Sequence, residues 1–153
     1  MRVFPVGGGL RDTAQARYIA AFVARVGHAF RVTLEAPVPI AGDLRAADIL
    51  LVAEGIRIAV EVITRVGDLQ AQIRVAQLKA RDLRAGRLII VIADTHANVR
   101  VLREQRPMLV SSFDLDFRGV MAALAAGRDP GRDALILLRL RDSIPSTPAK
   151  PMK

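Results

Sequence analysis

The sequence contains no cysteine and few of the residues that build metal or aromatic sites: two histidines, one tyrosine, five phenylalanines and no tryptophan among 153 residues. The lack of cysteine excludes a disulfide framework, a Cys-based zinc site, an iron–sulfur cluster and a thiol nucleophile. The low aromatic content argues against a stacking platform for single-stranded nucleic acid. No apolar run reaches the roughly 18 residues that span a membrane, and the N-terminus lacks a secretion signal. We therefore expect a soluble cytoplasmic protein.

Basic residues outnumber acidic ones. The chain has 23 Lys plus Arg against 15 Asp plus Glu, a formal net charge of +8, and only three of the basic residues are lysine. The pI of about 11.3 favours a polyanionic partner such as DNA. GC-rich coding, which enriches arginine, explains the same bias without DNA.

Length and composition predict one globular domain between two tails. The glycine triplet at 7–9 marks residues 1–10 as an N-terminal linker, and three prolines mark residues 142–153 as a flexible tail. Residues 11–141 then form the domain.

Hydrophobic periodicity predicts an α/β fold. Strict alternation predicts a half-buried strand with Val32, Leu34, Ala36 and Val38 on one side, and Gly86 fits the stop of the second helix. The predicted helices span residues 12 or 13 to 27, 68–84, 95–105 and 118–126, and the predicted strands span 31–38, 47–53, 56–63, 88–93 and 134–140. This order is typical of an α/β sandwich with a mixed sheet.

The strands at 47–53 and 56–63 are joined by Glu54 and Gly55, which predicts a hairpin with a two-residue loop. Paired residue numbers then sum to 109, so Asp48 lies across from Glu61. Opposed like charges destabilise a sheet, and a cation such as Mg²⁺ would offset the repulsion. The repulsion has three alternative explanations that need no metal: one of the acids has a raised pKa, an Arg lies beside the pair, or the register differs from the predicted one. In metal-free buffer, Asp48→Ala is expected to be neutral or stabilising.

The predicted order of elements resembles the PD-(D/E)XK nuclease superfamily. In both, a helix is followed by three strands, a helix and a strand, with acidic residues in the second and third strands. The resemblance implies that Asp48 and Glu61 hold Mg²⁺ and act in catalysis. The lysine of that motif, two residues after the second acid, is Ile63 here. Some members carry the basic group on the following helix, where Lys79 or Arg81 would take its role.

A closer resemblance covers most of the chain. It rests on PIAGDLRAAD at 39–48, EVITR at 61–65, LKARD at 78–82, ADT at 93–95 and AGRDPG at 126–131. These segments resemble the C-terminal domain of certain bacterial helix-turn-helix transcriptional regulators, a family that usually has Glu where this chain has Ile63. Because Met1 falls about where the family's linker begins, the resemblance implies a domain without its own helix-turn-helix, either free-standing or the remnant of a longer gene. DNA and a separate helix-turn-helix protein are the partners it implies.

Basic and amide side chains near the two acids are candidates for contacts with nucleic acid. The helix at 68–84 presents Gln70, Arg74, Gln77 and Arg81 on one polar stripe, which contacts phosphates or is simply solvated. Arg45 and Arg65 flank the acids in sequence.

Together these observations predict a restriction-endonuclease-like α/β sandwich of core order αβββαβ, with a mixed β-sheet and helices on both faces. The predicted function is a nuclease-fold accessory module of transcriptional-regulator type, catalytically degenerate and bound to DNA, a ligand or a partner protein. The alternative is a Mg²⁺-dependent DNA endonuclease that uses Asp48, Glu61 and Lys79.

Overall fold

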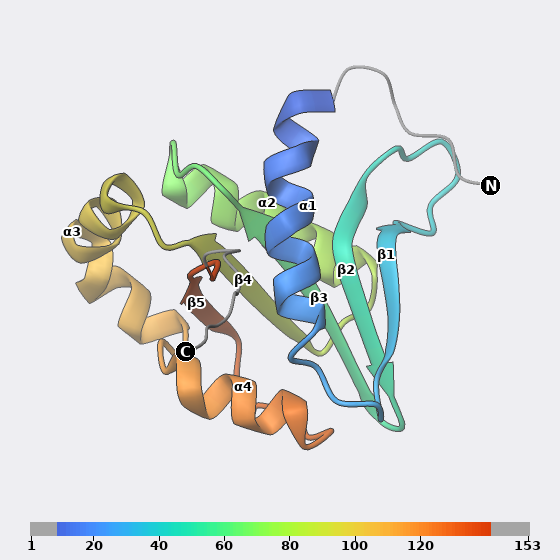
Figure 1. Cartoon of the computed structure of the whole chain (residues 1–153). Coiled ribbons are helices and arrows are strands. Elements are labelled where there is room, and N and C mark those ends of the chain that lie inside the picture. The colour runs from blue at the N-terminus through green and yellow to red at the C-terminus, as the bar shows by residue number, and fades with distance from the viewer. Residues whose placement is uncertain (1–8, 142–153) are drawn as a thin grey trace, which may run out of the picture.

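The computed structural model describes residues 9–141. In this part of the chain four helices and five strands follow one another in the order that the periodicity predicts (Figure 1). Their bounds are α1 (Gly9–Val23), β1 (Arg31–Pro37), β2 (Ala46–Ala53), β3 (Ile56–Ile63), α2 (Leu69–Asp82), β4 (Arg87–Ala93), α3 (His96–Ser112), α4 (Phe117–Ala125) and β5 (Ala134–Leu138).

The five strands form one mixed sheet in the order β1-β2-β3-β4-β5. β1, β2 and β3 pair antiparallel, whereas β3, β4 and β5 pair parallel through helical crossovers. Helices α1 and α4 cover one face, and α2 and α3 cover the other. The predicted α/β fold with a mixed sheet and helices on both faces is therefore confirmed.

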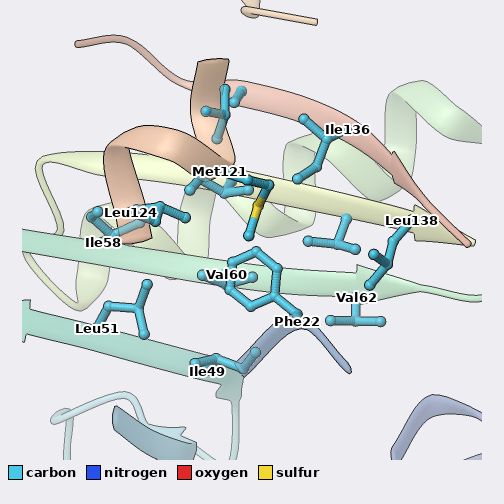
Figure 2. Packing of buried hydrophobic residues seen from close by; sticks show 14 of the residues in the cluster. Phe22, Ile49, Leu51, Ile58, Val60, Val62, Met121, Leu124, Ile136 and Leu138 are labelled. Carbon is cyan, nitrogen blue, oxygen red and sulfur yellow. The ribbon is translucent and has the colours of Figure 1, made fainter. Parts of the chain in front are cut away.

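Alternation along β3 divides the core between the two faces. Ile58, Val60 and Val62 pack into the cluster beneath α1 and α4, together with Phe22 and Leu124 (Figure 2). Ala59 packs into the cluster beneath α2 and α3. Because side chains alternate along a strand, Glu61 follows Ala59 onto the α2 face.

The hairpin register is the predicted one. The paired residues run from Ala53–Ile56 to Ile49–Val60, and each pair sums to 109. Pairing ends there, so Asp48 and Glu61 are the next residues in register and not a ladder pair. On the other side, the pairing of β1 with β2 omits Glu35 and Asp48, and Glu35 has φ of +50°. The register pairs on both sides of β2 therefore pass over Asp48.

Several predicted boundaries were wrong. α1 begins at Gly9 and takes two residues from the predicted linker, and it ends at Val23. The rest of that linker and the 142–153 tail lie outside the described residues. α3 continues past Gln105 and through Pro107, which removes one helical hydrogen bond, because Leu109 packs in the core. The alternation along β1 also misplaces one side chain. Leu34, which it puts on the same side as Ala36 and Val38, is 47% exposed, and β1 lies at the edge of the sheet.

The end of α2 gives a first testable prediction. Gly86 is not the helix stop: its N–H donates to the Arg57 carbonyl oxygen (2.8 Å), and the left-handed residue is Arg84, with φ of +59°. Glycine adopts this conformation without strain, so we expect Arg84→Gly to raise the free energy of unfolding by about 0.5–1 kcal/mol in urea titrations. Arg84→Ala keeps the strain and serves as the control; an equal gain in that variant would contradict the explanation.

Candidate active site

Three charged side chains meet where β2 and β3 separate. Lys79 Nζ lies 3.1 Å from Glu61 Oε1, and the Asp48 N–H donates to Glu61 Oε2 over 3.1 Å. Asp48 is on β2, Glu61 is on β3 and Lys79 is on α2. We call these three residues the acid–lysine cluster. The structure therefore brings together the three predicted catalytic residues, and with them the two predicted metal ligands.

The position of Lys79 follows from the helical period of α2. The residues of α2 that are buried against the sheet are Leu69, Ile73, Ala76 and Ala80. Lys79 precedes Ala80 and is only partly exposed, so its stem follows the sheet toward Glu61. Arg81, the other candidate for this role, is instead paired with Asp82 (2.9 Å).

Side-chain hydrogen bonds link β2 and β3 just beyond their last register pair, Ile49 and Val60. Asp48 Oδ2 accepts hydrogen bonds from the Val62 N–H (2.8 Å) and from Gln15 Nε2 (3.2 Å). Gln15 Nε2 also donates to the Val62 carbonyl oxygen (2.9 Å). Gln15 comes from α1, on the opposite face of the sheet, so this end of the hairpin is held from both faces.

Burial and like charge make Glu61 a weak acid. The residue is 8% exposed. The pKa of Glu61 is raised from its ordinary 4.5 to about 7, first by burial and then by the Asp48 carboxylate, while Lys79 opposes the rise. Glu61 therefore changes protonation near neutral pH, as a general acid or base must.

Glu61 opens onto a cavity of about 360 Å³. Ile63 lines it together with Asp68 and Gln72. The cavity lies beside β3 and the first half of α2, which places an opening next to the acid–lysine cluster.

The predicted nucleic-acid contacts are spread around this site and not gathered in it. Arg45 forms two ion pairs: its Nη2 lies 2.7 Å from Asp43 Oδ2 and 2.6 Å from Asp82 Oδ2. The hydrogen bonds from Arg45 lower the pKa of Asp43 to about 2. Its charge is therefore largely balanced by protein carboxylates.

Four other predicted contact residues are exposed: Arg65, Arg74, Gln77 and Arg81. None of them lines the cavity at Glu61. Gln77 and Arg81 line a different hollow, beside Arg87 and Asp133. Arg65 and Arg74 remain accessible to a polyanion.

The sequence reasoning missed Gln15 and Asn98. Asn98 is 2% exposed: its Nδ2 donates to the carbonyl oxygens of Thr64 (3.0 Å) and Ala93 (2.9 Å), and its Oδ1 accepts from the Val66 N–H (3.0 Å). The Thr95 hydroxyl caps the same helix by accepting the Asn98 N–H. Asn98 thus ties α3 to the loop that follows β3. The sequence pattern at Thr95 predicts the start of a helix, but nothing in it indicates that Asn98 bonds to the loop after β3.

The donor set of the cluster fits Mg²⁺. Within residues 9–141, no third His, Cys, Asp or Glu side chain joins Asp48 and Glu61 in a metal-binding group. Mg²⁺ is commonly held by one or two carboxylates, with water and substrate phosphate completing the coordination. Two adjacent carboxylates, one of them destabilised as an anion by the other, meet that requirement.

Comparison with known proteins found no matching family model, no matching curated protein and no matching solved structure. In the described part of the chain, no helix has both the length and the apolar character required to cross a bilayer.

The hydrogen bonds of Asp48 reverse the sign expected for its removal. Asp48→Ala leaves the Val62 N–H without its acceptor, so we expect a loss of about 1–2 kcal/mol in the free energy of unfolding, measured in metal-free buffer. Asp48→Asn keeps an acceptor and removes the charge, and is expected to match or exceed the wild type. If Asp48→Ala is as stable as Asp48→Asn, charge alone governs the position.

Proposed function

We propose that the chain is a restriction-endonuclease-like module whose acid–lysine cluster acts on phosphodiesters with Mg²⁺. One observation carries this proposal: the ammonium group of Lys79 lies 3.1 Å from Glu61, so a lysine is present although the motif position holds Ile63. The confirmed α/β fold with a mixed sheet, and the predicted hairpin register, agree with it.

The roles of the residues follow from their chemistry. Asp48 and Glu61 would hold the cation from adjacent strands. Mg²⁺ bound there would polarise a phosphodiester and promote deprotonation of a water. Lys79 would place a positive charge beside the phosphate, where negative charge develops during hydrolysis. Arg65 and Arg74 would contact the backbone of DNA, for which the net charge of +8 is suited.

A second function is favoured by the way the cluster is satisfied internally. Lys79 already balances one carboxylate, and the Asp48 carboxylate accepts two protein hydrogen bonds. These contacts suit a catalytically degenerate accessory module of the transcriptional-regulator type, which keeps the scaffold to associate with DNA or with a separate helix-turn-helix protein.

Thermal melting with and without millimolar Mg²⁺ or Mn²⁺ tests for the metal. A tenfold excess over Kd stabilises the folded state by about 1.4 kcal/mol, which raises Tm by roughly 3–6 °C. The rise should be larger at pH 8 than at pH 6, because the metal must displace the proton of Glu61. Glu61→Gln should lose the rise, whereas Glu104→Gln, which removes an exposed acid on α3, should keep it.

Cleavage of supercoiled plasmid DNA then separates the two functions. For a nuclease we expect nicking that needs the metal and falls about 100-fold or more in Lys79→Met. Metal-dependent stabilisation without nicking, together with salt-sensitive DNA binding, supports the accessory module instead. The absence of a metal-dependent Tm shift in the wild type would rule out the nuclease.

A further inference from the structure

A second cavity, of about 370 Å³, lies between α3 and β5, at a distance in sequence from the acid–lysine cluster. Its lining is mostly apolar and comes from α3, from β5 and from the segment that begins α4. The apolar lining residues are Val99, Leu102, Leu109, Leu115, Phe117, Leu135 and Leu137. Two exposed arginines, Arg103 and Arg106, complete the lining. Apolar walls with a few charged groups are typical of sites for small molecules.

A third cavity, of about 440 Å³, adjoins the second one and is strongly basic. The two share Val99 and Arg103. Three arginines and one histidine line the third cavity against a single carboxylate: Arg100, Arg103, Arg139, His96 and Asp94.

The arginines of this region have little compensation from protein carboxylates. Among the described residues 9–141, Arg139 is the one arginine lining these two cavities for which an ion pair is found, with Asp94 at 3.5 Å, and its side chain is 80% exposed. Arg100 and Arg103 are exposed on α3, and Glu104 of the same helix lines neither cavity. The positive charge at this end of the apolar cavity is therefore available to an anion.

We infer that these two adjoining cavities together bind a small amphipathic organic anion. Its apolar part lies between α3 and β5, and its carboxylate or phosphate group lies against Arg103 and its neighbours Arg100 and Arg139. An uncharged apolar molecule leaves the arginines without a counterion, and a free inorganic anion leaves the apolar cavity empty. Only a ligand with both parts is complementary to the whole site.

Calorimetric titration with straight-chain carboxylates from butanoate to octanoate tests the inference. Each added methylene that is buried should raise the affinity about fourfold. Octyl phosphate should bind at least as tightly as octanoate, and 1-octanol should bind at least about tenfold more weakly. These probes distinguish the two anionic groups from the apolar chain alone.

Matched variants locate the site. Arg103→Gln should weaken octanoate binding about tenfold or more, whereas Arg118→Gln, which changes an exposed residue of α4, should leave it unchanged. Val99→Phe fills the junction of the two cavities and should weaken octanoate more than butanoate. Glu61→Gln should bind octanoate as the wild type does, so this test stands apart from the proposed nuclease site.

Three results would overturn the inference: no binding of octanoate at millimolar concentration, affinity independent of chain length, or equal loss in Arg103→Gln and Arg118→Gln. Binding to phosphatidylglycerol vesicles with none to free octanoate or octyl phosphate would also overturn it, and would indicate a lipid surface instead.

Discussion

Asn98→Leu is expected to lower the free energy of unfolding by roughly 3–5 kcal/mol. The buried amide serves three backbone groups: the carbonyls of Thr64 and Ala93 and the N–H of Val66. Leucine has a similar volume but no polar atom, so all three groups lose their partner in a place that water reaches poorly. Urea unfolding of both proteins at pH 6 measures the difference.

Thr95→Ala provides the control for Asn98→Leu. It removes the N-cap of the same helix and leaves the three amide bonds intact, so the expected loss is only about 1 kcal/mol. If Asn98→Leu costs no more than Thr95→Ala, then the amide bonds contribute little, and Asn98 is not the tie between α3 and the loop after β3.

The stability of the wild type should fall as pH rises from 4.5 to 8, by an amount on the order of 3 kcal/mol. The cause is Glu61, whose pKa is raised from 4.5 to about 7 by burial and by Asp48. Between these two values the folded state binds a proton that the unfolded state releases. This contribution is complete below pH 4.5 and is lost as pH passes through about 7.

Urea titrations from pH 4.5 to 8 measure this dependence. Glu61→Gln stays uncharged at every pH, so its stability should lack this fall and should exceed that of the wild type at pH 8. Glu104→Gln should retain the wild-type dependence. A parallel fall in Glu61→Gln would show that another group titrates in this range.

The hairpin and its acids could be predicted because they depend on local rules. Alternation with a two-residue loop fixes the register of β2 and β3, and the register fixes which face Glu61 takes. The resemblance to the nuclease superfamily left Lys79 or Arg81, on the following helix, as the basic partner. Only the packed helix decides between them, because Arg81 lies beside Asp82 and Lys79 beside Glu61.

The supporting contacts could not be predicted, because they depend on how distant elements cross. Gln15 reaches Asp48 only because α1 runs over the opposite face of the sheet, and no pattern in α1 marks it. The left-handed backbone of Glu35 and the passage of α3 through Pro107 run against local preference. In α3, packing of the helix outweighs the lost bond, as tertiary contacts commonly outweigh propensity.

The amide of Asn98 has a further consequence, because it lies between the two sites. The next residue, Val99, lines both cavities at α3. Asn98 itself donates a hydrogen bond to the carbonyl oxygen of Thr64, and the residue before Thr64, Ile63, lines the cavity at Glu61. The three bonds of Asn98 therefore fix α3 and that loop relative to each other. If a ligand were to shift α3 against the sheet, the loop beside the acid–lysine cluster would have to shift with it, and such a coupling would act equally in both directions.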